Sequence, residues 1–309
     1  MMLHALRRNL GLVFIVLLLG AAFYHVAIDF KDKWDLRDSY YSHGYLILPI
    51  SAFLVYRKRG ELAGLGIRPS SGGMAVLVVG CLMRLVGAFS RINFLSGFAL
   101  IVVVLGLVLH LWGRAVTWKL LFPILFLVAM VPAPTQFVNK VSFRMKIAAA
   151  QATVKILNRF GTGIVRTGSN LDFINRANEP DKLVVGDVCS GLRSLIALVA
   201  FGALFAYISS VSLWKKLVLF LAAMPAAFIA NWVRILVITL IAITWGSPAA
   251  VQVNYLQKIG LGSIAGDWGT MHDITGILIY VVAFIVLFSL EKLLVRLGPQ
   301  PKQPLEQPA

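Results

Sequence analysis

Residues 217–243 read LVLFLAAMPAAFIANWVRILVITLIAI, an apolar run that contains one charged side chain, Arg234. About twenty apolar residues of helix cross the hydrocarbon core of a bilayer, so a run of this length predicts a membrane-spanning helix. A charged side chain inside such a helix is costly and usually faces protein or water. Arg234 is therefore a candidate functional residue, and Asn231 shares its helical face at a spacing of three residues.

Similar apolar runs recur along the 309-residue chain, which is 59% hydrophobic and 14% charged, with a mean hydropathy of +0.84. Water-soluble domains are far less apolar, so we expect an all-α polytopic membrane protein with about eight transmembrane helices. Residues 1–297 are predicted to form one transmembrane domain, and the Pro/Gln-rich residues 298–309 a disordered cytoplasmic tail. The predicted spans are 10–28, 43–56, 73–90, 93–112, 116–131, 189–208, 217–243 and 273–290, of which 43–56 and 116–131 are short enough to be re-entrant.

The charge distribution predicts the orientation of these spans. A formal net charge of +16 would also fit a nucleic-acid-binding protein, but the basic residues lie mainly in short segments between apolar runs, so we expect no nucleic-acid partner. Arg7 and Arg8 precede a run of spanning length without a clear cleavage site, so the first run is expected to be retained. Basic clusters fall on alternate loops, which places both termini in the cytoplasm. The other clusters are Arg57/Lys58/Arg59/Arg68, Arg114/Lys119, Lys215/Lys216 and Lys292/Arg296.

The longest connection between spans, residues 135–188, is predicted to lie outside the cytoplasm. Its first part, 136–160, mixes apolar and basic side chains in the pattern of a short helix that lies flat in the membrane interface, in contact with lipid. Its second part, 161–188, is rich in Gly, Thr, Asn and Val. With short strands at Ile164–Val165 and Lys182–Val185, this part predicts a small β-like cap.

Cys189 is the candidate nucleophile. It lies within Gly186–Ser194, GDVCSGLRS, where the sixth predicted span begins. The positive end of a helix lowers the pKa of a thiol and favours the reactive thiolate, and Arg193 adds a second positive charge on the same helical face. A membrane cysteine is more often only a small buried hydrophobic residue, and Cys81, inside the third predicted span, fits that description.

His272 lies at the outer mouth of the last predicted span, and its near-neutral pKa suits proton transfer. His43 competes for this role, because it also lies at an outer helix end. His43, His272 and Asp273 are metal-ligand types, but they lack the helical His-Glu-x-x-His spacing, so we expect neither a metal nor a cofactor. A thiol, a guanidinium and an imidazole at one membrane face would make a site for acyl transfer.

These residues resemble the exosortase/archaeosortase family of polytopic membrane cysteine transpeptidases, over most of the chain. The strings Cys-Ser-Gly-Leu-Arg-Ser and Asn-Trp-Val-Arg-Ile are the specific part of the resemblance. His272, followed by Gly276, fits the family's third catalytic position. The segments that carry the resemblance are 42–46 with the basic stop at 57–59, then 131–134, 188–194 and 225–235.

The resemblance implies a cysteine peptidase and transpeptidase, a hydrolase of the bacterial inner membrane, with its active site and cap facing the periplasm. Its partners would be exported proteins with a C-terminal sorting signal (a Pro-Glu-Pro-like motif, a transmembrane helix and a basic tail), and an unknown acceptor nucleophile, often in organisms that make exopolysaccharide. Cys189 would be the nucleophile, Arg234 a catalytic cation and His272 the third catalytic residue. Some longer relatives carry a further C-terminal domain, and from the short tail we expect none in this chain. The substrate-binding or supporting residues would be Arg193, Asn231, His43 and Ser190.

Two other functional classes compete with this interpretation. A multi-spanning glycosyl or polysaccharide-lipid transferase in exopolysaccharide production would use outer arginines to bind diphosphate, but it would not require Cys189. A transporter would place charged residues along several helices at mid-membrane depth and would show internal repeats, whereas the polar groups here cluster at one end of the spans.

Overall fold

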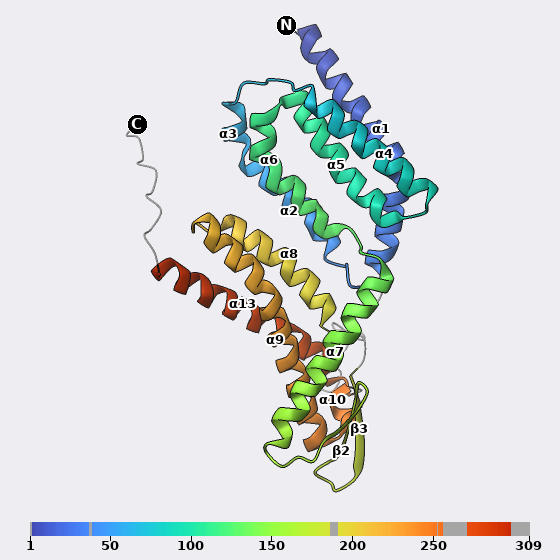
Figure 1. Cartoon of the computed structure of the whole chain (residues 1–309), viewed down its shortest axis with the longest axis vertical. Helices are drawn as coiled ribbons and strands as arrows, with labels where there is room; N and C mark the ends of the chain where they lie inside the picture. Colours follow the sequence, from blue (N-terminus) through green and yellow to red (C-terminus); the bar gives the residue numbers. More distant parts are fainter. Residues whose placement is uncertain (1, 37–38, 186–190, 252, 256–270, 298–309) are drawn as a thin grey trace. The chain divides into compact units, whose positions relative to one another are not determined.

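The computed structural model describes residues 2–36, 39–185, 191–251, 253–255 and 271–297. Side chains are described from Leu10 onward within these ranges, apart from those of residues 12 and 271–273. The chain folds mainly as helices and divides into two compact units, unit 1 (Met1–Pro134) and unit 2 (Thr135–Ala309) (Figure 1).

Unit 1 is helical throughout the elements that the structure describes. Helix α1 packs against α5, and α2 packs against α6 and η1. Pro123 lies inside α6, and the hydroxyl of Ser51 in α2 donates a hydrogen bond of 2.7 Å to its carbonyl oxygen. The elements are α1 (Met2–Asp35), α2 (Gly44–Arg57), α3 (Arg59–Ala63), α4 (Gly72–Phe89), α5 (Asn93–Trp112), α6 (Arg114–Phe126) and the 3₁₀ helix η1 (Leu127–Met130).

Glycines bring α4 and α5 into close contact. Gly73, Gly80 and Gly87 recur at a seven-residue spacing on α4, and all three are buried. A Cβ atom added at Gly80 would lie 2.7 Å from Cγ2 and 2.9 Å from the backbone nitrogen of Val103 in α5. Small residues that let two backbones approach closely are a main source of helix association in lipid. The glycine face of α4 therefore determines the packing of this helix pair.

Two side chains from the N-terminal part of unit 1 form hydrogen bonds with backbone groups near the C-terminal end of this unit. The indole Nε1 of Trp34 donates to the carbonyl oxygen of Met130 at 3.2 Å, and the backbone N–H of Ala133 donates to the hydroxyl of Tyr41 at 3.0 Å. Pro132 lacks an N–H donor, so the helix cannot continue with regular hydrogen bonds at this point. Unsatisfied backbone groups are costly in a low-dielectric environment, and these two side chains remove part of that cost.

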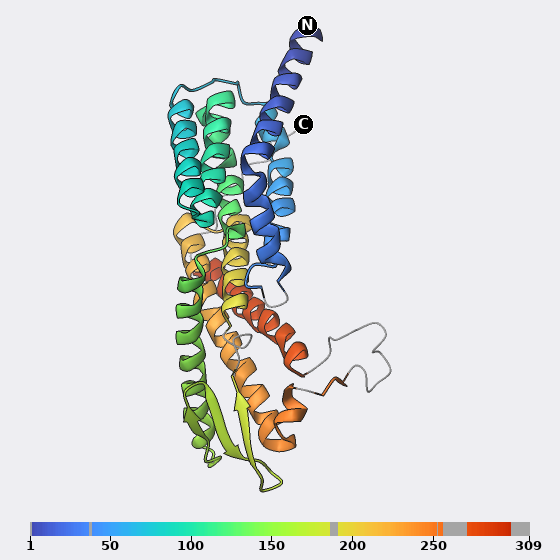
Figure 2. The same cartoon turned by 90° about the vertical axis from the view of Figure 1, so that its right-hand side faces the viewer.

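Unit 2 is built around one long helix, α9, which contacts α8 and α13 along part of its length and α7 and α10 along another part (Figures 1 and 2). Small buried residues of α9, among them Ala223, Ala227 and Ala230, let these neighbours approach closely. The elements are α7 (Thr135–Asn158), β1 (Val165–Thr167), β2 (Asn170–Ile174), β3 (Pro180–Val184), α8 (Leu192–Ile208), α9 (Leu213–Trp245), α10 (Ser247–Val251) and α13 (Met271–Arg296).

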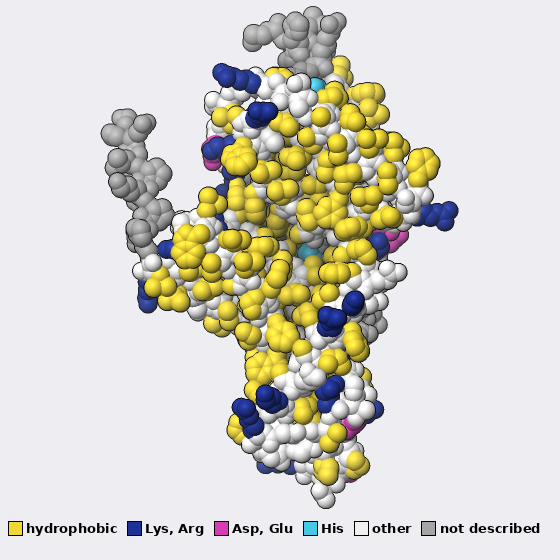
Figure 3. Space-filling model, viewed as in Figure 1, with side chains coloured by type: hydrophobic (Ala, Val, Ile, Leu, Met, Phe, Trp, Pro, Cys, Tyr) yellow, Lys and Arg dark blue, Asp and Glu magenta, His cyan; other side chains and the backbone are white. Residues whose placement is uncertain are grey.

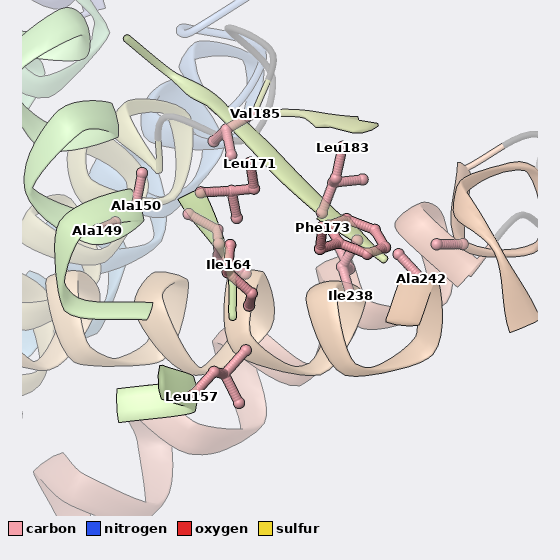
Figure 4. Packing of buried hydrophobic residues seen from close by; sticks show 12 residues of the cluster. Ala149, Ala150, Leu157, Ile164, Leu171, Phe173, Leu183, Val185, Ile238 and Ala242 are labelled. Atoms are coloured by element: carbon pink, nitrogen blue, oxygen red, sulfur yellow. The ribbon is translucent and has the colours of Figure 1, made fainter. Parts of the chain in front are cut away.

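The three strands form an antiparallel sheet in the order β1-β2-β3. Leu171 pairs with Leu183 across β2 and β3, and both side chains are buried, with Phe173 beside them. These residues pack against α7 and the C-terminal half of α9, as Figure 4 shows. Alternating side chains of a strand point to opposite faces, so one face of the sheet supplies this core. The full cluster is Ala149, Ala150, Leu157, Ile164, Leu171, Phe173, Leu183, Val185, Ile235, Ile238, Ala242 and Ala250.

Asp181 ties the sheet to α10. Its carboxylate accepts hydrogen bonds from the backbone N–H of Ser247, at 2.6 Å, and from that of Lys182, at 2.7 Å. Burial by itself would raise the pKa of Asp181, but these hydrogen bonds outweigh it and hold the pKa below its usual value. A second tie joins the sheet to the end of α9, where the backbone N–H of Arg176 donates to the carbonyl oxygen of Ile243 at 2.8 Å.

The predicted count of eight membrane spans is not confirmed. Among the described residues, five helices are long and apolar enough to cross a membrane, or six if α6 with η1 and α7 count as one broken span. The predicted runs at 43–56 and 189–208 correspond to α2 and α8, which are apolar helices of 14 and 17 residues. Both are shorter than the roughly twenty residues that a perpendicular span requires.

The helix predicted over residues 136–160 corresponds to α7, which has 24 residues and nearly the same bounds. It runs beside the C-terminal half of α9 (Figures 1 and 2). Basic side chains follow α7 on the face shown in Figure 3, whereas hydrophobic side chains cover most of α8, α9 and α13. A position flat in the membrane interface stays a prediction for α7, as does a periplasmic location for the sheet.

Candidate active site

Asn231 and Arg234 lie inside unit 2, not on its surface. They are one helical turn apart on α9, and their exposed fractions are 0% and 5%. An arginine at this depth in an apolar helix must contact protein or water, because the hydrocarbon of lipid would strip its hydration. The sequence-based prediction that this turn of α9 faces the protein interior is therefore consistent with the burial of both side chains.

Gly191, immediately before α8, packs against Asn231. Gly191, the N-cap residue of α8, has a φ of 74°, a left-handed conformation that side chains other than glycine rarely adopt. A Cβ atom added at Gly191 would lie 2.4 Å from Cγ of Asn231. The carbonyl oxygen of Gly191 accepts hydrogen bonds from the backbone N–H of Leu195, at 2.8 Å, and from the Ser194 hydroxyl, at 2.9 Å. Both the backbone conformation and the buried amide therefore require glycine here.

Helix α13 approaches the same turn of α9 from another side. A Cβ atom added at Gly276 would lie 3.8 Å from Nη2 of Arg234. His272 belongs to the first turn of α13, one helical turn before Gly276. The turn that carries Asn231 and Arg234 is thus bordered by the start of α8 and by the first turns of α13.

A second cation and a tyrosine complete this region. Arg193 lies in the first turn of α8 and is half-buried. Tyr280 lies one turn beyond Gly276 on α13 and packs against the cluster that includes Leu198, Ala227 and Ala230. Sequence analysis missed Tyr280, although its four-residue spacing from Gly276 and eight-residue spacing from His272 indicate a shared side of the helix.

Part of the predicted site lies outside the described residues. Cys189 and Ser190 fall there, and the side chain of His272 does too. The structure places Asn231 and Arg234 on one buried turn of α9, near Gly191 and Gly276, and Arg193 in the first turn of α8. The catalytic and supporting roles of all the predicted residues stay predictions.

His43 lies in unit 1, at the N-cap of α2. Its Nε2 atom is 3.2 Å from the carbonyl oxygen of Ala129 in η1, and its ring lies beside that of Tyr41. This contact gives His43 a structural function at the end of η1, close to the hydrogen bonds that Trp34 and Tyr41 make. A supporting role in the reaction stays a prediction for His43.

Within the described ranges, no three His, Cys, Asp or Glu side chains form a group that could hold a metal ion. The chemistry available in the described part of the site comes instead from two guanidinium groups, a carboxamide and a phenol. Guanidinium groups donate hydrogen bonds and carry a fixed positive charge, which suits them to stabilise an oxyanion or to bind a carboxylate.

The model of the transmembrane exosortase family (Exosortase_EpsH) matches residues 34–289, which is most of the chain. This match confirms the resemblance drawn from the four sequence segments. It begins at the end of α1, covers most of both compact units and ends within α13. Neither the curated proteins nor the solved structures contain a match to the chain.

Proposed function

The chain belongs to the transmembrane exosortase family, and on that premise we propose that it is a membrane-embedded cysteine transpeptidase. Its substrates are exported proteins with a C-terminal sorting signal, made of a Pro-Glu-Pro-like motif, a transmembrane helix and a basic tail. It cleaves near the motif, at the periplasmic face of the bacterial inner membrane, and passes the new carboxyl end to an acceptor nucleophile or to water.

One observation carries this proposal: a single buried turn of α9 contacts both segments that lead to the other predicted catalytic residues. Asn231 packs against Gly191, and Arg234 packs near Gly276. Cys189 is two residues from Gly191 in sequence, and two residues of chain reach at most about 7 Å. His272 is one turn, about 6 Å along the helix axis, from Gly276. The proposal therefore requires no long rearrangement of the chain to assemble the three groups.

The proposed reaction follows from the chemistry of these side chains. The Cys189 thiolate attacks the carbonyl carbon of the scissile peptide bond, and the guanidinium of Arg234 stabilises the oxyanion that forms. His272 protonates the departing amine, which leaves an acyl thioester on Cys189. The acceptor then loses a proton to His272 and attacks the thioester, so the thiolate is regenerated. Arg193 adds positive charge beside the thiol, which favours its ionised form.

The length of α9 supports a location of this site near the outer membrane surface. At about 1.5 Å per residue, the stretch from Lys216 to Arg234 rises about 27 Å, close to the thickness of a bilayer's hydrocarbon core. We assign Lys216 to the cytoplasmic side on the positive-inside rule. Arg234 then lies at the opposite boundary, where a substrate emerging from the membrane presents the peptide bond that follows its exported domain.

Co-expression with a tail-signalled substrate tests the proposed function. We expect wild type to release a shortened substrate, and Cys189→Ala, Arg234→Ala and His272→Ala to lose that processing at normal protein levels. Cys81→Ala removes the other cysteine of the chain, which is exposed on α4, and should process normally. A covalent substrate adduct that accumulates in wild type and is released by hydroxylamine would identify the thioester.

The same experiment separates the proposal from its alternatives. Processing that persists in Cys189→Ala would rule out thiol chemistry. A glycosyl or polysaccharide-lipid transferase would keep its activity in that variant, because its diphosphate substrate needs cations and no thiol. Arg84→Gln is a further control, since Arg84 of α4 donates to the carbonyl oxygen of Ala22 and has no part in the proposed site.

A further inference from the structure

An apolar groove with a volume of about 510 Å³ runs along α13. It lies on the side of the helix opposite the buried residues Ile279, Ala283 and Leu287. The groove is apolar over most of its length and has a cation at its C-terminal end, so its shape and chemistry suit an amphipathic ligand. The residues that line it are Val281, Phe284, Ile285, Phe288, Ser289 and Lys292.

Aromatic contacts with α8 hold two walls of this groove in place. The rings of Phe284 and Phe201 lie edge to face with their centroids 6.0 Å apart, and those of Phe288 and Phe205 do so at 4.9 Å. Edge-to-face contacts are a favoured geometry for aromatic pairs and restrict the rotation of each ring. The groove is therefore a built feature of the α8–α13 pair.

The cationic end of the groove is available to an anion. Lys292 lines the groove, Arg296 follows it by one helical turn, and both side chains are exposed. Among the ion pairs of the described residues, none involves either of these cations. The neighbouring carboxylate of Glu291 is directed to α8, where it accepts a hydrogen bond from the hydroxyl of Ser209. An anionic group at this end would meet positive charge alone.

Contacts with α9 fix the same end of α13. The Nζ atom of Lys215, in the first turn of α9, donates to the carbonyl oxygen of Leu294 at 2.6 Å. Leu294 is buried in a cluster with Ala206 of α8 and Leu219 of α9. Lys215 belongs to the basic cluster that the positive-inside rule assigns to the cytoplasm, so the cationic end of the groove lies on the cytoplasmic side as well.

We propose that this groove binds one anionic phospholipid of the cytoplasmic leaflet, with an acyl chain along the apolar wall and the phosphate at Lys292. The length of the groove favours this ligand over a substrate helix. From Val281 to Lys292 the helix rises about 16 Å, close to half of a hydrocarbon core of about 30 Å, whereas a transmembrane helix crosses the whole core. Basic pockets between helices on the cytoplasmic side are typical sites for acidic lipid headgroups. This binding does not depend on the proposed transpeptidase function.

Native mass spectrometry of the full-length protein with phosphatidylglycerol or phosphatidylcholine tests the headgroup contact. One cation near a membrane surface strengthens the binding of an anionic lipid about fivefold. Lys292→Gln should therefore weaken phosphatidylglycerol binding about fivefold and leave phosphatidylcholine binding unchanged. The matched control is Lys119→Gln, because Lys119 pairs with Glu61 in unit 1 and should keep wild-type binding of both lipids. Equal affinity of wild type for the two lipids, or an unchanged affinity in Lys292→Gln, would overturn the proposal.

A pair of tryptophan variants tests the groove itself. Ile285→Trp places a large ring inside the groove, whereas Ile277→Trp places it on the same helix outside the groove. Ile285 and Ile277 are similarly exposed, at 60% and 53%, so both substitutions should leave the Tm in detergent near that of wild type. We expect weaker phosphatidylglycerol binding in Ile285→Trp alone. Equal binding by the two variants would show that the acyl chain lies elsewhere.

Photocrosslinking in a bilayer identifies the occupant directly. We would place a diazirine amino acid at position 285 and irradiate the protein in nanodiscs that contain equal amounts of phosphatidylglycerol and phosphatidylcholine. Adducts with phosphatidylglycerol should exceed those with phosphatidylcholine about fivefold, and the excess should disappear in Lys292→Gln. Equal adducts with the two lipids would identify ordinary contact with bulk lipid and overturn the proposal. A crosslink to polypeptide in place of lipid would overturn it as well.

Discussion

Gly191 shows at the scale of one residue how the chain builds its site. Two independent requirements meet there: a φ of 74°, and a Cβ position 2.4 Å from Cγ of the buried Asn231. The first requirement concerns the backbone and the second concerns packing, and only glycine meets both. The same glycine is the N-cap of α8 and follows Cys189, the proposed nucleophile, by two residues in the sequence.

A pair of alanine variants separates these two requirements. Gly163 has a similar φ of 66° but no neighbouring atom within 4 Å of an added Cβ. Gly163→Ala should therefore cost only the left-handed strain, about 1 to 2 kcal/mol of folding stability. Gly191→Ala adds the clash with Asn231, so we expect substrate processing to fall at least tenfold below that of Gly163→Ala. Equal processing by the two variants, at equal protein levels, would show that Asn231 does not constrain this turn.

The site residues that were predicted from the sequence differ physically from the one that was not. Asn231 and Arg234 could be predicted as site residues, because a polar side chain inside an apolar run costs free energy and therefore indicates a specific role. Tyr280 was not visible, because a tyrosine in a membrane helix is common and its environment depends on how α13 packs against α8 and α9. His43 was visible as a polar residue at a helix end, but its contact with the carbonyl oxygen of Ala129 depends on tertiary structure.

At the scale of elements, α4 and α5 show how small residues hold helices together. In lipid the hydrophobic effect does not favour one apolar contact over another, so helix association depends on close packing. Gly80 lies at the middle of the three buried glycines of α4, and Val103 of α5 fills the space beside it. A substitution at this contact therefore tests helix packing without altering the proposed site.

Gly80→Leu should separate these helices and destabilise unit 1. We expect a loss of several kcal/mol, since overpacked sites typically cost 1 to 3 kcal/mol and this clash includes backbone atoms. Thermal unfolding in detergent would measure it as a lower Tm. The control is Gly20→Leu on α1, where an added Cβ meets nothing within 4 Å. A Tm for Gly80→Leu that equals that of Gly20→Leu would contradict this account of the α4–α5 contact.

Element positions were predicted better than element contacts. The apolar run 93–112 coincides with α5, and the run 73–90 differs from α4 by one residue at each end, because hydropathy is a local property. The strand prediction found parts of β1 and β3 but missed β2 (Asn170–Ile174). Strand β2 contains Asn170 and Asp172, residues of low strand preference, and it is held by antiparallel neighbours on both sides.

At the scale of the whole molecule, the number of membrane spans is the prediction that the structure does not confirm. Apolar composition identified α2 and α8 as helices, but their 14 and 17 residues fall short of a full span. Helix α9 is instead longer than one span requires. Its 33 residues give a length of about 50 Å, whereas the hydrocarbon core of a bilayer is about 30 Å thick. The C-terminal part of α9 is the part that α7, the sheet and α10 surround, and its core includes Ile238 and Ala242.

This excess length explains how unit 2 can combine membrane and extramembrane parts. The N-terminal two thirds of α9 pack with α8 and α13, whose surfaces are apolar (Figure 3). The last third supports a small mixed core with the sheet (Figure 4). Arg234 lies where the first environment gives way to the second. A site at that boundary can accept a peptide whose transmembrane helix remains in the bilayer, as the proposed substrates require.

The most direct test is whether positions 189 and 272 are neighbours. In a Cys81→Ala background, His272→Cys leaves two cysteines, and a short bifunctional thiol reagent should join them within one chain, which mass spectrometry of the proteolysed protein would detect. Ile277→Cys is the control, because Ile277 is 53% exposed on a different side of α13. We expect efficient cross-linking of Cys189 to position 272 and little to position 277. Cross-linking to position 277 but not to 272, in folded protein, would contradict the convergence of the thiol, the guanidinium and the imidazole.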